Sequence, residues 1–175
     1  MKRIIPIILI VLTCSCGHNQ NRVKYNPYTI SDNEGSSSNY FEIPFKTHPS
    51  NVKTIYVKMN DVSGTDAIFD TGCSGFLISL LEAQELAKHG TLTEYDERDA
   101  SYSSIADGSV VLNAKYRIGE VSVTDVNGKV HSVGNVTATV VENPRADVLV
   151  GNAIIDQLAT TSYTIDLVNS VIRFQ

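Results

Sequence analysis

Residues 67–74 read Ala67-Ile68-Phe69-Asp70-Thr71-Gly72-Cys73-Ser74, and this stretch decides how the rest of the chain is interpreted. An apolar run leads into an acid, a hydroxyl and a glycine. A carboxylate placed after residues that favour burial costs free energy unless its surroundings satisfy it, which makes Asp70 a candidate catalytic group. Thr71 can hydrogen-bond to the backbone, and Gly72 allows a sharp turn. The alternative is a structural acid that caps this turn.

The Asp-Thr-Gly triplet occurs once, and no Asp-Ser-Gly accompanies it. If the chemistry uses two such acids, they must come from two chains.

Length and composition indicate one folded domain preceded by a leader. The chain has 175 residues, of which 42% are hydrophobic and 19% are charged, as in ordinary globular proteins. The formal net charge is −5, and no cluster of Lys and Arg follows the leader. A nucleic-acid partner is therefore not expected.

The first 16 residues have the features of an export signal. Met1-Lys2-Arg3 supplies positive charge, and Ile4 to Leu12 is apolar but too short for a stable membrane span. The cysteines that follow resemble the lipobox of bacterial lipoproteins, with lipidation at Cys14 or Cys16. We expect an exported protein of the cell envelope, held at the membrane by a lipid anchor. The alternative is an ordinary cleaved secretory signal.

The remainder divides into a flexible tether and a folded domain. Residues 17–39 are rich in Asn and Ser and predict the tether, and residues 40–175 predict the domain. β-branched and aromatic runs between turn residues predict strands in that domain. The predicted strands are Tyr40 to Lys46, Lys53 to Met59, Thr65 to Asp70, Val110 to Ile118, Glu120 to Thr124, Val130 to Val141, Tyr163 to Asp166 and Val171 to Phe174.

Two segments predict short helices, Leu80 to His89 and Asn152 to Leu158. Ser79 and Glu82 have the spacing of a capping box at the start of the first helix, and Gly90 marks its end. Short strands, tight turns and two small helices predict an all-β fold, a small closed β-barrel.

The order of these pieces resembles the retropepsin-like aspartic protease family (clan AA). The resemblance covers roughly residues 50 to 175: a strand, Asp-Thr-Gly, a short helix, a hairpin tipped by Asp107-Gly108, and then Leu149-Val150-Gly151 with a second helix. In this family an apolar-apolar-Gly element passes under the active-site loop, and Leu149-Val150-Gly151 matches it.

The resemblance implies a homodimer in which Asp70 of each chain meets across a two-fold axis. The two carboxylates would share a proton and activate water. Thr71 would brace the loops at the axis, and Gly72 would present its backbone to an extended peptide. Ala106, Asp107 and Gly108 would form the flap over that peptide. Retroviral members pair an acid with an arginine where this chain has Ser74 and Asn152, so that ion pair is missing.

Other candidate groups suggest no competing chemistry. Cys73 is interpreted as a small buried residue, because no histidine is close in sequence and the protein is expected to be exported. Gly72-Cys73-Ser74 lacks the second glycine of a serine nucleophile elbow, since Phe76 occupies its place. The four histidines lack metal-ligand spacing and are all interpreted as surface residues.

The sequence therefore predicts an aspartic endopeptidase that needs no metal or cofactor and acts on a peptide or protein substrate. The alternative is a non-catalytic lipoprotein of the same fold that binds a peptide or partner. The intact Asp-Thr-Gly triplet favours the protease.

Overall fold

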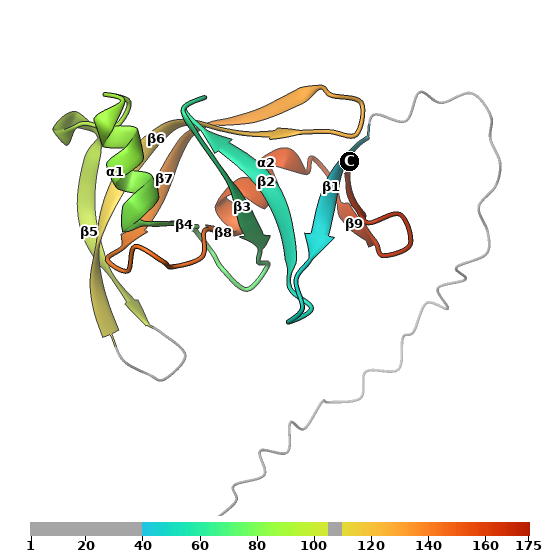
Figure 1. Ribbon diagram of the computed structural model, residues 1–175, viewed down its shortest axis with the longest axis horizontal. Coiled ribbons are helices and arrows are strands. Elements are labelled where there is room, and N and C mark those ends of the chain that lie inside the picture. Colours follow the sequence, from blue (N-terminus) through green and yellow to red (C-terminus); the bar gives the residue numbers. More distant parts are fainter. Residues whose placement is uncertain (1–39, 105–109) are drawn as a thin grey trace, which may run out of the picture. The chain divides into compact units, whose positions relative to one another are not determined.

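The computed structural model describes residues 40–104 and 110–175, and within these ranges it is mostly β (Figure 1). The strands are β1 (Phe41–Thr47), β2 (Lys53–Met59), β3 (Ser63–Phe69), β4 (Phe76–Ser79), β5 (Glu97–Ser104), β6 (Val110–Thr124), β7 (Val130–Val141), β8 (Leu149–Val150), β9 (Tyr163–Asp166) and β10 (Val171–Phe174). The helices are α1 (Leu80–Lys88), α2 (Asn152–Leu158) and the single 3-10 turn η1 (Glu94–Asp96). The prediction of a mostly-β chain with two short α-helices is confirmed.

The described strands form one continuous sheet in the order β5-β6-β7-β4-β8-β3-β2-β1-β10-β9. An additional pairing between β6 and β2 joins six of them, β6, β7, β4, β8, β3 and β2, into a ring. Strand β5 extends from β6 on one side, and β1, β10 and β9 continue from β2 on the other. The closed arrangement that we expected thus includes six strands, and four lie outside it.

Strand β8 is the element that fixes the position of the Asp70 loop. It lies between β3, to which it is parallel, and β4, to which it is antiparallel. Its register places Val150 opposite Phe69 of β3 and opposite Phe76 of β4. The loop between β3 and β4 therefore starts and ends beside the strand that leads into α2.

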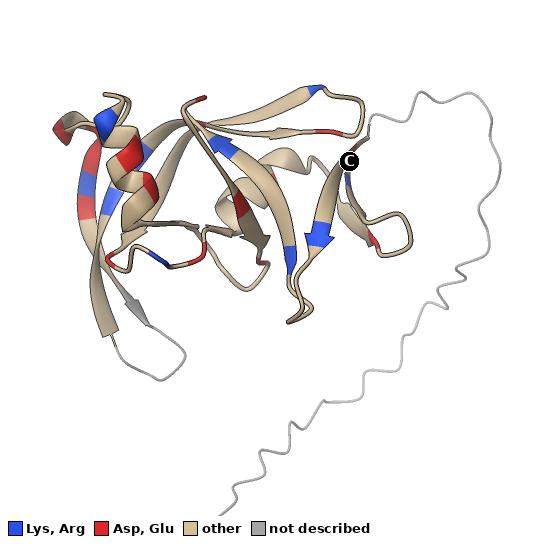
Figure 2. Ribbon diagram, viewed as in Figure 1, with Lys and Arg blue, Asp and Glu red and all other residues tan. Residues whose placement is uncertain are grey.

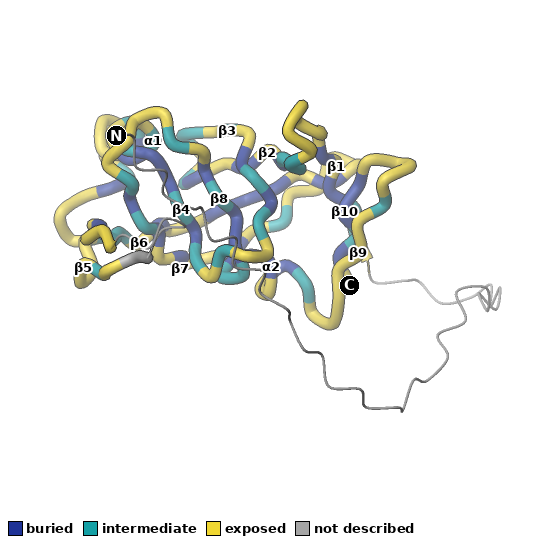
Figure 3. Tube along the Cα trace, turned by 90° about the horizontal axis from the view of Figure 1, so that it is seen from below, coloured by how far each residue is buried: buried dark blue, intermediate teal, exposed yellow. Residues whose placement is uncertain are grey.

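Alternation of buried and exposed side chains builds the core. In β2 the side chains of Ile55, Val57 and Met59 are buried, whereas Tyr56 and Lys58 face solvent. This period of two is what a half-buried strand requires. Figure 3 shows the buried positions concentrated in the central strands and the exposed ones at the hairpins. Each large apolar side chain that is fully buried contributes about 1.5–3 kcal/mol.

Helix α1 begins at the predicted capping box. The Ser79 Oγ accepts hydrogen bonds from the N–H groups of Leu81 and Glu82, and the Glu82 carboxylate accepts from the Ser79 N–H. Gly90 follows the helix with a φ of 70°, a conformation that favours glycine.

Strand β6 is longer than expected. We predicted two strands interrupted at Gly119, but β6 is continuous through this glycine. The side chain of Asn60 accepts a hydrogen bond from the Glu120 N–H at 3.0 Å, and a Cβ on Gly119 would lie 3.1 Å from that Asn60 oxygen. The glycine thus allows the turn after β2 to approach closely, and it does not interrupt the strand.

The interpretation of His131 as a surface residue is wrong. Its side chain is 15% exposed, and its ring stacks on that of Phe41 with centroids 3.7 Å apart. The Nε2 atom lies 3.0 Å from the Asp125 carboxylate, which also accepts from the N–H groups of Asn127 and Lys129. Phe41 comes from the first strand, so nothing near His131 in the sequence indicates this burial.

The charges of the described residues are dispersed. Figure 2 shows Lys and Arg spread over several described strands, without an unbroken run of them along any one of these strands. Among these residues no group of three or more His, Cys, Asp or Glu side chains is arranged to hold a metal ion. No helix in residues 40–104 and 110–175 is long and apolar enough to cross a membrane.

The buried Asp125 gives a testable pH dependence. The hydrogen bond from His131, followed by those from the backbone of Lys129 and Asn127, lowers the pKa of Asp125 below its usual value. A lowered pKa in the folded state stabilises the protein above the unfolded pKa of about 4, and this contribution is lost as the pH falls through the folded value. Urea unfolding from pH 7 to pH 2 should therefore show a stability loss below pH ~4. This loss should be smaller in Asp125→Asn, and identical slopes in the two proteins would contradict it.

Candidate active site

Asp70 follows directly after β3 and is held by the backbone of β8. Its N–H donates to the Val150 carbonyl at 3.0 Å, continuing the β3–β8 pairing by one residue. The residue is half-buried, and the next two residues, Thr71 and Gly72, are exposed. The carboxylate of Asp70 thus lies at the edge of the core, at the end of an apolar strand, as the sequence predicts.

The turn after Asp70 is closed by its own side chain. The Gly72 N–H donates to Oδ1 of Asp70 at 2.9 Å, and the Cys73 N–H donates to the Asp70 carbonyl at 3.1 Å. This arrangement, in which an aspartate accepts from the backbone two residues later, is an Asx turn. No described residue donates to Oδ2. One carboxylate oxygen therefore fixes the loop, and the other has no donor in the part of the chain that the structure describes.

The loop lies directly on the start of α2. The N–H groups of Gly151, Asn152 and Ala153 donate to the carbonyls of Gly75, Cys73 and Ser74 at 3.0, 2.8 and 3.1 Å, respectively. The first N–H groups of a helix have no partner within the helix, and the N-cap Gly151 has no side chain that could accept from them. The loop carbonyls therefore serve as the cap of α2.

Gly151 is required for this contact. A Cβ at this position would lie 2.3 Å from the carbonyl oxygens of both Cys73 and Gly75. The Leu149-Val150-Gly151 element thus passes against the Asp70 loop, as the family resemblance implies.

Asn152 occupies the position at which retroviral members of the family have an arginine. Its side-chain Nδ2 donates to the Thr71 carbonyl at 3.4 Å, across 81 residues of sequence. Ser74, the counterpart of the missing acid, contributes its backbone carbonyl. Neutral hydrogen bonds hold the loop here, and the sequence alone did not identify Asn152 as a bracing residue.

Cys73 is half-buried, and its Sγ donates to the Gly75 carbonyl at 3.6 Å. No described histidine hydrogen-bonds to it. This environment fits a small packing residue in the loop.

A cavity of about 730 Å³ adjoins the loop. The loop residues Gly72 to Gly75 form one wall, and Tyr102 of β5 and Lys115 of β6 contribute to the others. The predicted flap residues Ala106, Asp107 and Gly108 lie between these two strands, outside the described residues. Cys14 and Cys16 also lie outside them.

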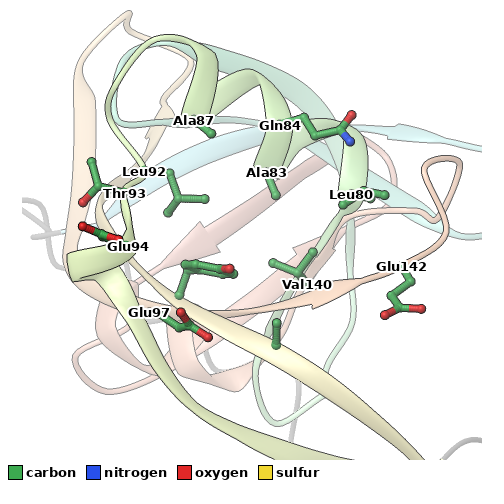
Figure 4. Close-up of a pocket in the computed structure, with 12 residues that line it drawn as sticks. Leu80, Ala83, Gln84, Ala87, Leu92, Thr93, Glu94, Glu97, Val140 and Glu142 are labelled. Carbon is green, nitrogen blue, oxygen red and sulfur yellow. The ribbon is translucent and has the colours of Figure 1, made fainter.

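A second cavity of about 460 Å³ lies between α1 and the other face of the β6–β7 pair (Figure 4). Ala83 and Val140 contribute apolar surface to it, and Glu94, Glu97 and Glu142 lie around it. None of its described lining residues belongs to the Asp70 loop. It is therefore separate from the candidate active site.

The chain is similar to known proteins in sequence and in fold. A family model described as aspartyl protease matches residues 55–154. Among curated proteins, none matches the sequence. The structure is similar to that of a retropepsin-like aspartic protease from Rickettsia conorii, with a TM-score of 0.54 and 16% identity over 77% of this chain and 89% of that one. Basic 7S globulin from soybean matches with a TM-score of 0.48 and 15% identity over 79% of this chain and 42% of that one.

The packing of Gly151 against the loop is open to a direct test. Gly151→Ala should lower the free energy of unfolding by about 1–3 kcal/mol, because the new methyl group displaces the carbonyls that cap α2. Urea denaturation measures this loss. Gly75→Ala is the matched control, since a Cβ there meets nothing within 4 Å. Equal stability of the two variants would show that the loop does not rest on Gly151.

Proposed function

The chain belongs to the aspartyl protease family, and we propose that it is an endopeptidase in which a carboxylate dyad, one Asp70 from each chain of a homodimer, activates water. The observation that carries the proposal is the loop at Asp70. It holds one carboxylate oxygen through the Gly72 N–H and leaves the other without a described donor.

The proposed reaction uses the two Asp70 carboxylates in different protonation states. One ionised carboxylate takes a proton from the water as it attacks the peptide carbonyl, and the protonated partner gives its proton to the carbonyl oxygen. Two carboxylates in contact share one proton because both cannot be ionised at once, which is the established behaviour of aspartic protease dyads. The hydrogen bond from the Gly72 N–H to Oδ1 keeps each carboxylate in one orientation. The carboxylates therefore lose less conformational freedom when the reaction occurs.

A homodimer follows from the single triplet. Each chain offers one Asp-Thr-Gly, so the second acid comes from a second copy. Thr71 and Gly72 are exposed beside the half-buried Asp70, which leaves this face of the loop accessible to a partner. In the dimer Thr71 would lie at the two-fold axis and brace the two loops.

Strand β9 supports an interface close to this axis. Among the described strands it lies at the edge of the sheet, and its Tyr163 and Ile165 are 37% and 38% exposed. The Tyr163 ring contacts that of Phe69, the residue before Asp70, with centroids 5.6 Å apart. An unpaired edge with apolar side chains is a ready template for a second chain. Pairing there would bury this surface near the Asp70 loop.

We also propose that the substrate is an extended peptide covered by the β5–β6 hairpin, with Ala106, Asp107 and Gly108 as the flap. Strands β5 and β6 pair antiparallel up to Ser104 and Val110. Export and lipid anchoring at Cys14 or Cys16 remain part of the proposal on the strength of the leader sequence. The anchor would hold the domain at the cell envelope.

The catalytic role of Asp70 is tested by Asp70→Asn. The neutral amide cannot take a proton from water, so cleavage of a diverse peptide pool from pH 4 to 7 should fall by at least about a thousandfold. Asp66→Asn is the control, because Asp66 lies on β3, the strand that leads into Asp70, is exposed and pairs only with the surface residue Lys46 among the described residues. Equal cleavage by wild type and Asp70→Asn, or none by either, would contradict the protease assignment.

The dimer is tested by sedimentation of the chain without residues 1–16. The dissociation constant should rise at least about tenfold in Ile165→Arg, because a charge would be buried in the β9 interface. Val130→Arg provides the control, since Val130 is 57% exposed on β7. Activity should rise with the square of protein concentration below the dissociation constant. A monomer that cleaves peptides would overturn the two-chain site.

A further inference from the structure

The cavity beside the Asp70 loop contains one charged side chain among its described lining residues, that of Lys115. Its wall begins at Gly72, whose N–H binds the Asp70 carboxylate. Whatever enters the cavity therefore lies next to the proposed reactive group. An extended peptide advances about 3.3 Å per residue. We expect the side chain that enters to belong to a residue close to the scissile bond.

Lys115 lies in the middle of β6 and is half-buried. On one side it is opposite Thr139 of β7, and on the other it is opposite Arg98 of β5. Neighbouring residues Ala114 and Tyr116 line the cavity on the other face of the sheet, as alternation along a strand requires. The side chain of Lys115 thus lies on the face of the sheet that is directed toward the Asp70 loop.

Lys115 forms no ion pair with any described residue. Arg98, directly opposite, donates to the carbonyls of Tyr95 and Glu97 and is likewise without an ion pair in residues 40–104 and 110–175. Like charges that face each other across antiparallel strands are destabilising. An anion that enters the cavity would supply the acidic partner that Lys115 lacks among the described residues.

The other polar groups of the cavity are neutral. Thr137 and Thr139 line it on β7, and Ser101 lines it on β5. Hydroxyl groups can donate to a carboxylate as well as accept from an amide, whereas the lysine ammonium only donates. The cavity therefore offers hydrogen-bond donors and one positive charge, a set that fits a carboxylate.

We propose that Lys115 is a specificity-determining residue that selects substrates with an aspartate or glutamate close to the scissile bond. The inference rests on the proposed protease function of Asp70 and names the substrate class of that site. A hydrogen bond between two charged groups is stronger than one between a charged and a neutral group. The uncharged isostere glutamine should thus bind less well than glutamate in the same place.

A cleavage experiment tests the selection. Fluorogenic peptides with a varied apolar centre carry Glu, Gln or Lys at each flanking position, and kcat/KM is compared among the three members of each set. Wild type should prefer Glu at one flanking position by about tenfold or more. The preference should disappear in Lys115→Gln, reverse toward Lys peptides in Lys115→Glu, and persist in Lys115→Arg.

Lys129→Gln is the matched control for net charge, because Lys129 is exposed in the turn between β6 and β7. It should keep the wild-type preference. The conservative Lys115→Arg keeps the positive charge and the apolar stem, whereas Lys115→Gln removes the charge, so the two variants together separate the effect of charge from that of packing.

A binding experiment tests the subsite without the need for peptide cleavage. The Asp70→Asn protein is titrated with the same Glu and Gln peptides, labelled for fluorescence anisotropy, with and without Lys115→Gln. Glu peptides should bind about tenfold more tightly than Gln peptides only when Lys115 is present.

The two arms distinguish the possible failures. Cleavage with equal rates for Glu and Gln peptides would overturn the role of Lys115 and leave the protease function intact. Binding of Glu peptides through Lys115 without cleavage by wild type would support the subsite and overturn the protease function. Equal binding of Glu and Gln peptides by Asp70→Asn would overturn the subsite.

Discussion

The contact between the Asp70 loop and the start of α2 is the constraint on which the rest of the site depends. Backbone N–H groups of Gly151 to Ala153 need acceptors, and the carbonyls of Cys73 to Gly75 supply them. The same hydrogen bonds cap a helix and fix a loop, so neither element can move alone. Only a glycine permits this approach at position 151, because a Cβ would overlap two of the carbonyls. Strand β8 brings the two segments together by pairing with β3 and β4 at once.

In the proposed protease, the hydrogen bonds of the loop would hold the single acid in one orientation. The Gly72 N–H holds one oxygen of Asp70, and the side chain of Asn152 holds the Thr71 carbonyl. These are neutral hydrogen bonds in the place where retroviral relatives are expected to use an ion pair, so the loop should not depend on salt. In the proposed homodimer a second copy supplies the second acid, and the exposed Thr71 and the strand β9 would form the surfaces of contact.

Part of the fold follows from local sequence. The bounds of β2, β7, β9, β10 and α2 agree with the predictions, because alternation, turn residues and helix length are local properties. The capping box of Ser79 and Glu82 is local too. Strand β5 was missed because Glu97–Ser104 contains no β-branched residue, and its pairing with β6 makes it a strand. His131 was misjudged because its partner Phe41 is distant in sequence.

The sequence by itself determined that Asp70 ends an apolar strand, that it occurs in one Asp-Thr-Gly, and that glycines allow the turns around it. Each of these is a property of neighbouring residues. Only the tertiary structure decided that Asn152 braces Thr71, that the loop carbonyls cap α2, and that Lys115 faces the loop rather than α1. The physical reason is strand register. A shift of one residue in the pairing of β6 would turn Lys115 to the other face, and register is set by the packing of the whole sheet.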